Sequence, residues 1–196
     1  MGRKNVQELK FRRRREAKTN YAKRLALVKG NLDRIVVRRS NKRIIGQIIR
    51  YSEKGDVVLY SADSRELKAM GWPARSNRSS AYLTGMLLGS KLKGEDRQRE
   101  YILDIGLNSP VKNSIPFVFA KGCKEDGIKL RGVFEVDVKF YDSSLVSGYA
   151  KELKEKDAKA YERQFSTYAK EKVTVESMSK LFIEAKEKIK GGAINK

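Results

Sequence analysis

Three short apolar runs, separated by polar turns, predict an antiparallel β-meander in the first third of the chain. The runs cover residues 34–38, 43–51 and 57–61 and are rich in isoleucine and valine, which favour strands. The turns at residues 40–42 and 53–56 are short enough to join antiparallel neighbours directly. We therefore expect two successive hairpins.

A short helix is predicted just before this meander. Tyr21, Leu25 and Val28 recur at helical spacing, and the run ends at the Gly-Asn pair of residues 30–31. Either Thr19 or Asn20 could cap its first turn, because both side chains can accept a bond from a backbone N–H.

A longer helix is predicted after the meander, from the serines at 79–80 to about residue 93. Its small residues Ala81, Gly85 and Gly89 fall four apart on one face. A glycine inside a helix costs about 1 kcal/mol relative to alanine. We therefore expect this face to pack very closely, on a sheet.

A strand and a third helix follow. Residues 101–106 are apolar enough for a buried strand, and Ser114 could cap a helix that has Pro116 in its first turn and ends at Gly127. Alternating strands and helices indicate a crossover connection that packs helices on the sheet. Residues 62–78 are expected to be mostly loop, and residues 132–141 fit either a strand or an extended segment.

The last fifty residues differ in character, with charged amphipathic helices expected at 143–168 and 177–189, separated by residues 171–174. We expect them to pack lightly on the body or on another partner. The chain thus divides into a basic arm with a short helix (1–29), an α/β domain (30–141) and a C-terminal helical extension (142–196). The predicted fold class is α/β, a mixed sheet with a meander and crossover helices.

Positive charge is concentrated at the amino end. The net charge is +20, and residues 1–50 hold 17 basic and 3 acidic side chains, whereas residues 51–144 hold 15 and 13. Such a balance indicates a polyanionic partner. The near-neutral middle is typical of an ordinary folded domain. We therefore expect the arm to make most of the contacts with the polyanion, which could be RNA, DNA or an acidic membrane.

The arm contains four consecutive arginines, Arg12 to Arg15, followed by further cations. Arginine binds phosphate bidentately, and Phe11 and Tyr21 could stack on bases. Like charges this dense repel, so the arm should be poorly ordered without a partner. A targeting signal or a solubilising tail is the alternative interpretation.

Three further segments could contact RNA. The turn at residues 38–43 holds four cations and two small polar side chains, although a plain solvated turn would also fit. The loop 72–78 places Trp72 beside two arginines, but a tryptophan next to proline is equally typical of a core. The polar loop 108–113 leads to a helix N-terminus, which can accept phosphate, and this signal is the weakest of the three.

Several function classes are disfavoured. The chain has one cysteine, Cys123, and no histidine, which excludes histidine-bearing zinc sites, CxxC pairs and Ser-His or Cys-His catalysis. Neither GxxxxGK[ST] nor GxGxxG occurs. No apolar run reaches the roughly 20 residues that span a bilayer, and no secretory signal is visible. We expect a cytoplasmic protein without cofactor, metal, membrane or small-molecule substrate.

One enzymatic alternative stays open, a metal-dependent RNA-processing nuclease on the same α/β core. Its carboxylates would be Asp56, Asp63 and Asp104. Nothing in the sequence brings the three together, so a structural role for Asp104, in capping or in pairing with a cation, is the favoured interpretation.

Several collinear blocks resemble one known family. They are RRRREAKTNY at 12–21, RRSNK at 38–42, GW at 71–72, SAYLTG at 80–85 and LDIGLNSP at 103–110. Together they resemble the large-subunit ribosomal protein family numbered eighteen in the universal scheme, in its archaeal form. The resemblance covers roughly residues 10–130. It departs where the family often has Ile-Pro-His, since Ile128-Lys129-Leu130 stands there instead.

The resemblance implies a non-catalytic constituent of the large subunit that binds 5S ribosomal RNA and helps attach it to 23S ribosomal RNA in the central protuberance. Neighbouring ribosomal proteins are the other implied partners. RNA contacts are carried over to residues of the arm and the turn, and less firmly to three loop residues. They are Arg12, Arg13, Arg14, Arg15, Lys18, Thr19, Tyr21, Arg24, Arg38, Arg39, Ser40, Asn41, Lys42, Asn77, Asn108 and Ser109.

Overall fold

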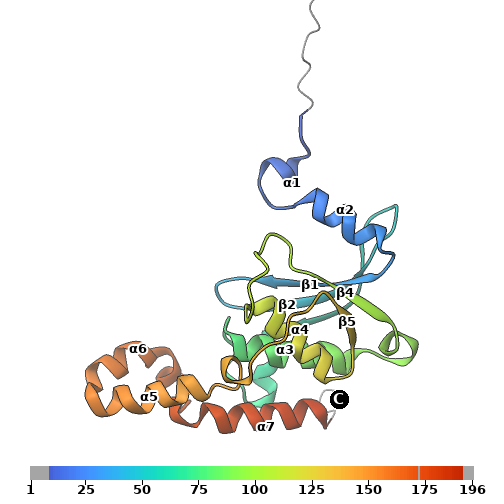
Figure 1. Cartoon of the computed structure of the whole chain (residues 1–196). Helices are drawn as coiled ribbons and strands as arrows, with labels where there is room; N and C mark the ends of the chain where they lie inside the picture. Colours follow the sequence, from blue (N-terminus) through green and yellow to red (C-terminus); the bar gives the residue numbers. More distant parts are fainter. Residues whose placement is uncertain (1–8, 172, 192–196) are drawn as a thin grey trace, which may run out of the picture.

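A five-stranded mixed sheet, in the order β3-β2-β1-β4-β5, forms the centre of the molecule (Figure 1). The computed structural model describes residues 9–171 and 173–191. Part of the predicted arm, residues 1–8, lies outside the described residues. The strands are β1 (Asp33–Arg39), β2 (Ile44–Arg50), β3 (Val57–Asp63), β4 (Glu100–Asp104) and β5 (Lys129–Arg131).

The predicted meander is confirmed, because β1 pairs antiparallel with β2 and β2 pairs antiparallel with β3. β4 runs parallel to β1, and β5 runs parallel to β4. Parallel neighbours need a crossover connection, and α4 (Ile115–Glu125) supplies the one between β4 and β5. The predicted α/β class and mixed sheet are confirmed.

Helices α3 (Arg78–Lys91) and α4 cover one face of the sheet and cross each other closely. A Cβ added at Gly85 would overlap the carbonyl of Phe119, and one added at Gly122 would overlap the carbonyl of Tyr82. The expectation that the small-residue face packs on the sheet is therefore wrong. Its close approach is to a second helix, because both backbones reach contact where neither carries a side chain.

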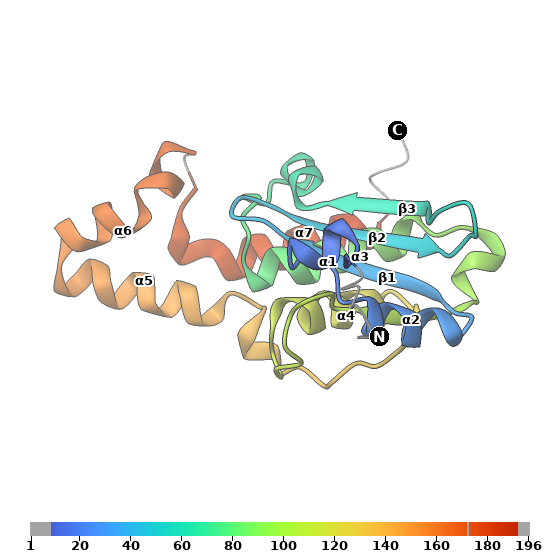
Figure 2. The same ribbon diagram turned by 90° about the horizontal axis from the view of Figure 1, so that it is seen from above.

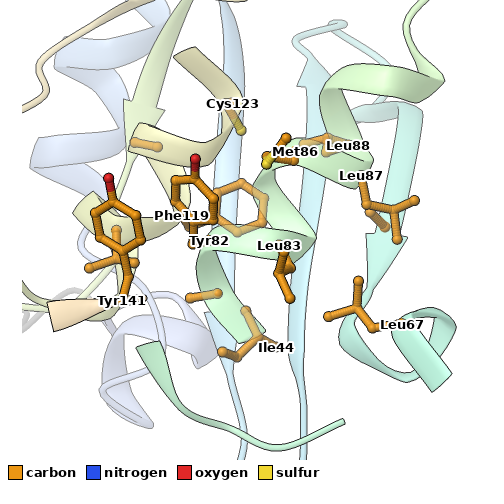
Figure 3. Close-up of a cluster of buried hydrophobic side chains, with 14 of the residues drawn as sticks. Ile44, Leu67, Tyr82, Leu83, Met86, Leu87, Leu88, Phe119, Cys123 and Tyr141 are labelled. Carbon is orange, nitrogen blue, oxygen red and sulfur yellow. The ribbon is translucent and has the colours of Figure 1, made fainter. Parts of the chain in front are cut away.

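The interior between sheet and helices is apolar and aromatic (Figure 3). Tyr82 from α3 stacks on Tyr141 with ring centroids 4.3 Å apart. Trp72 is 1% exposed, and its indole N–H donates to the Ser80 hydroxyl at 2.9 Å. Of the two interpretations of Trp72, the core residue is confirmed.

The amino-terminal helices α1 (Arg12–Arg15) and α2 (Tyr21–Lys29) lie over the opposite face of the sheet (Figure 1). The predicted helix at 21–29 is confirmed, and its cap is Asn20, whose side chain accepts from the Lys23 N–H at 3.1 Å. None of the nine α2 residues is buried. The arm therefore rests on the sheet without joining its core.

Three helices follow the α/β body. They are α5 (Ser144–Lys156), α6 (Ala158–Lys170) and α7 (Met178–Lys190). The single helix expected at 143–168 is wrong, because Asp157 leaves the helical conformation and caps α6 by accepting from the Ala160 N–H. Helices α5 and α6 project from the side of the body (Figure 2). α7 packs on α3 and contributes Phe182, Ala185 and Ile189 to the common core.

Short 3-10 helices occupy four connections, η1 (Ser64–Met70), η2 (Gly94–Arg97), η3 (Val138–Phe140) and η4 (Val175–Ser177). The first replaces part of the loop expected at 62–78, because Asp63 and Glu66 form a capping box that starts a helical turn. The undecided segment 132–141 holds no strand and carries η3. None of the helices described is long and apolar enough to cross a membrane. The domain boundaries after residues 29 and 141 stay predictions.

Candidate nucleic-acid interface

The face of the sheet opposite α3 and α4 carries a groove between the arm and strand β1, here called the arm groove. It encloses about 570 Å³. Cationic and polar side chains from the arm, from β1 and from the segment after β4 line it, including Arg13, Lys18, Thr19, Lys23, Arg24, Arg38, Arg39 and Asn108. Segments far apart in the sequence thus contribute to one concave basic surface.

A second groove adjoins the first and is here called the loop groove. It is lined by the end of β1, by the start of α3 and by the loop before α4, including Arg39, Ser76, Asn77, Arg78, Asn108 and Ser109. Arg39 and Asn108 line both grooves. The two hollows therefore form one continuous surface along this side of the molecule.

Nine of the sixteen sequence-predicted contact residues line these grooves: Arg13, Lys18, Thr19, Arg24, Arg38, Arg39, Asn77, Asn108 and Ser109. The other seven do not line them: Arg12, Arg14, Arg15, Tyr21, Ser40, Asn41 and Lys42. All of these seven except Tyr21 are exposed, either on α1 or at the β1–β2 turn. Their contacts with RNA stay predictions.

The described part of the arm is folded back on itself by local contacts. Arg13 donates from Nε to the Thr19 hydroxyl at 2.8 Å, and the rings of Phe11 and Tyr21 lie 5.3 Å apart. Glu16 pairs with Arg12 at 3.3 Å, within an exposed turn where such pairs are worth little. Glu16 also pairs with Lys18 at 2.9 Å, and it is the one acidic side chain in residues 9–29, so most of the positive charge in this described part of the arm is not neutralised internally.

The β1–β2 turn is closed by Ser40. Its hydroxyl donates to the Arg43 carbonyl and accepts from the Arg43 N–H, both at 3.1 Å. Arg43 points back to Asp63 at 3.3 Å. The turn therefore places Arg38, Arg39 and Lys42 at its outer side, where they are exposed.

Hydrogen bonds join this turn to the neighbouring loops. The Ser76 hydroxyl donates to the Ser40 carbonyl at 2.6 Å and accepts from Arg39 Nε at 3.2 Å. Arg78 Nε donates to the Asn113 carbonyl at 2.9 Å. The turn, the loop before α3 and the loop before α4 are thus fixed relative to one another, which lowers the ordering cost of binding a rigid polyanion.

The polar loop residues predicted to contact RNA also make hydrogen bonds within the fold. Asn77 caps α3 by accepting from the Ser80 N–H at 2.8 Å, and Asn108 donates to the Ile105 carbonyl at 2.7 Å. Ser114 stands at the N-cap of α4, as expected, but its hydroxyl makes no capping bond. That hydroxyl is buried without a partner among the described residues and lies in the wall of the loop groove.

A buried arginine in the floor of the arm groove was missed from the sequence. Arg34 is 3% exposed, and it donates to Asp56 at 2.7 Å and to Asp104 at 3.0 Å. The alternation of Arg34, Val36 and Arg38 along β1 could have put it on this face. Its two partners come from the β2–β3 turn and from the end of β4, which only the pairing of the strands brings together.

The three carboxylates of the nuclease alternative, Asp56, Asp63 and Asp104, do not form a metal site. Arg34 lies between Asp56 and Asp104 and neutralises both, whereas Asp63 pairs with Arg43 and caps η1 at the far end of β3. Among residues 9–171 and 173–191, no group of three or more metal-ligating side chains could hold an ion. The favoured structural role of Asp104, pairing with a cation, is confirmed.

The floor of the arm groove is electrically balanced, while its rim is cationic. Arg34 and Arg24 offset Asp56 and Asp104. On the rim, Arg13, Lys23, Arg38 and Arg39 form no ion pair with any residue that the structure describes. Unpaired guanidinium and ammonium groups around a fixed hollow are suited to phosphates on more than one side.

Comparison with known proteins shows that the chain is similar to ribosomal proteins of the large subunit. A family profile described as "Ribosomal large subunit proteins 60S L5, and 50S L18" matches residues 5–95. The chain is 41% identical over 182 residues to the large ribosomal subunit protein uL18 of Methanococcus maripaludis. That alignment covers 91% of this chain and 93% of the relative, so the similarity extends beyond the α/β body into the C-terminal helices.

Proposed function

The chain belongs to the uL18 family of large ribosomal subunit proteins, and on this premise we propose that it binds 5S ribosomal RNA and helps to attach it to 23S ribosomal RNA in the central protuberance. Family membership makes it a structural component of the large subunit rather than an enzyme. The RNA species and the contact residues are the proposal.

The observation that carries this proposal is the convergence of unpaired cations on the one sheet face that α3 and α4 leave free. The arm, β1 and the loop after β4 meet there around the arm groove. Phosphate contacts contribute most of the affinity for nucleic acid, and folded RNA is recognised largely by shape and backbone. A preformed basic hollow with aromatic Tyr21 in the adjacent arm fits such a partner.

Contacts with neighbouring ribosomal proteins are part of the same proposal. One corner is left out of it. Ile128-Lys129-Leu130 departs from the Ile-Pro-His often found in the family, and here Lys129 and Leu130 open the edge strand β5. Any family contact made through that corner is not carried to this chain.

The direct test is a binding titration of the full chain with 5S ribosomal RNA and with a length-matched RNA duplex. At physiological salt we expect 5S RNA to bind at least about tenfold more tightly, because a fixed surface distinguishes RNA shapes whereas charge alone does not. Equal affinity for the two RNAs would reduce the chain to a general polyanion binder and would refute the proposal.

The role of the β1–β2 turn can be tested by charge reversal with Arg39→Glu and Lys42→Glu. We expect affinity for 5S RNA to fall by about tenfold or more while the domain stays folded, since both side chains are exposed and the change removes only the one bond from Arg39 to Ser76. The matched control is Lys156→Glu with Lys159→Glu, which makes the same charge change on the projecting helices. If both pairs weaken binding equally, the turn has no specific role.

A further inference from the structure

One carboxylate of the body, that of Asp56, forms an ion pair with the basic arm. Arg24 of α2 donates from Nη2 to Oδ2 of Asp56 at 3.0 Å, and the same oxygen accepts from Arg34 Nη2 at 2.7 Å. Asp56 lies in the turn between β2 and β3, 32 residues from Arg24. This is the one ion pair between α2 and the sheet among the residues that the structure describes.

No residue of α2 is fully buried, although Leu27 and Val28 are half-buried. All of its residues are partly or fully exposed, and Leu25 is 56% exposed. The bonds that shape the arm elsewhere, such as Arg13 to Thr19, are internal to it. The cap of α2 at Asn20 is also internal to the arm, so the bond from Arg24 to Asp56 is the polar side-chain contact that ties the described part of α2 to the body.

The carboxylate is itself held rigidly. Arg34 is buried and is fixed from its other side by Asp104, whose second oxygen accepts from the Gly106 N–H at 2.9 Å. A chain of bonds therefore runs from the arm through Asp56, Arg34 and Asp104 to the loop that carries Asn108. Two segments with RNA-contact roles in the proposed function are linked by it.

An acidic residue in the floor of an RNA-binding groove lowers the affinity for RNA by charge alone, because it repels phosphate. Pairing with the buried Arg34 is one reason for the carboxylate of Asp56, and its bond to Arg24 points to a second. We propose that Asp56 is a positioning residue, which docks the arm through Arg24 and holds the arm groove open in the shape that RNA binds. The effect on RNA binding rests on the proposed function. The docking of the arm does not, because it is a property of the free protein.

The two effects of Asp56 have opposite signs, and this makes the inference testable. Asp56→Asn removes a negative charge from the groove and, by charge alone, should strengthen RNA binding. If Asp56 positions the arm, the same change should weaken binding. Glu53→Gln is the matched control, because Glu53 lies in the same turn, is exposed and pairs with no described residue.

The first measurement is hydrogen exchange of the free, full-length protein. We expect amides of Tyr21–Lys29 to exchange about two- to fivefold faster in Asp56→Asn and in Arg24→Gln, and to be unchanged in Glu53→Gln. Arg24→Gln leaves Arg34 with both of its carboxylates, so it tests the docking even if Asp56→Asn loosens the sheet. Combining the two changes should add nothing further. Equal exchange in all variants overturns the inference.

The second measurement is affinity for 5S RNA. We expect Asp56→Asn to bind about two- to fivefold more weakly than Glu53→Gln, although both variants carry the same net charge. Asp56→Asn binding as tightly as Glu53→Gln, or more tightly, would contradict the positioning role. If the unaltered chain fails to bind 5S RNA, the proposed function falls, whereas the exchange experiment still decides whether Asp56 docks the arm.

Discussion

At the residue scale, charged side chains of one strand divide into two kinds. Arg34 is buried and saturated by carboxylates, whereas Arg38 and Arg39 are exposed and have no acidic partner among the described residues. Composition counts all three as equal positive charges. Only their surroundings separate an arginine that holds the protein together from one that is available to phosphate, because a buried charge must be paired within the fold.

The crossing of α3 and α4 gives a sharp residue-scale prediction. Gly85→Ala would drive a Cβ into the Phe119 carbonyl, so we expect the free energy of unfolding to fall by about 1–3 kcal/mol or more. The matched control is Gly148→Ala in α5, where an added Cβ meets nothing, and which should stabilise by about 0.5–1 kcal/mol. Denaturant unfolding measures both. A neutral Gly85→Ala would contradict the close crossing.

Tyr101 gives a prediction about alkaline pH. Burial, together with nearby Asp96 and Asp33, raises the pKa of Tyr101 from 10.0 to about 12, and its hydroxyl donates to the Asp96 carbonyl at 2.6 Å. The folded state thus favours the neutral phenol. This contribution to stability is complete below about pH 10 and is lost as pH rises toward 12.

The comparison variant is Tyr101→Phe, which has no proton to lose. We expect it to be less stable at neutral pH, through loss of the hydrogen bond, but to lose less stability than the original chain between pH 10 and 12. Denaturant unfolding at both pH values measures this. Parallel losses in the two proteins would show that Tyr101 does not titrate with the fold.

At the element scale, the strands and most helices follow from the sequence because their signals are local. The meander strands begin and end within two residues of their predicted limits, and α2 and α4 lie where their periodicity indicates. The break at Asp157 was missed, because amphipathic character continues across it from α5 to α6. The 3-10 helix η1 was missed because a capping box without a following apolar period gives little signal.

Helix α7 was expected to pack lightly, but it belongs to the core. Its charged surface hides an apolar stripe that packs into an aromatic cluster, with the ring of Phe182 5.5 Å from Tyr82 and 5.9 Å from Trp72. A sequence shows that a stripe exists, but it does not show what covers the stripe. The structure supplies α3 as the partner and makes α7 part of the core.

Two adjacent residues of α7 test this packing. Phe182 is 4% exposed and Ile183 is 55% exposed. We expect Phe182→Ala to lower the free energy of unfolding by about 3–5 kcal/mol and Ile183→Ala to change it by about 0.5 kcal/mol or less. Thermal or denaturant unfolding distinguishes them. Similar small effects for both would mean that α7 is only loosely attached.

At the scale of the whole molecule, the basic character of the candidate interface could be predicted from the sequence, but its shape could not. Charge counts identified the arm and the turn. The joining of these with the loop after β4 depends on the parallel pairing of β1 and β4, which sets Val36 opposite Asp104 and brings both strand ends to one edge. Long-range pairing leaves no local signal, so the floor formed by Arg34, Asp56 and Asp104 could not be predicted.

The segregation of charge predicts different contributions to RNA binding from the two ends of the molecule. Residues 1–50 carry a balance of +14 and residues 145–196 one of +4. The arm lies over the sheet face opposite α3 and α4, whereas α5 and α6 project sideways (Figures 1 and 2). Loss of positive charge should therefore affect RNA binding strongly at the arm and weakly at the C-terminal helices.

The salt dependence of 5S RNA binding tests this most directly. With Arg12 to Arg15 all changed to Ala, we expect much weaker binding and a slope of log affinity against log salt that is smaller by about three to four. The control changes Lys151, Lys156, Lys159 and Lys170 of α5 and α6 to Ala, the same loss of charge, and should leave the slope nearly unaltered. An arm variant with the slope of the original chain would contradict the account, because the arm would then be making no phosphate contacts.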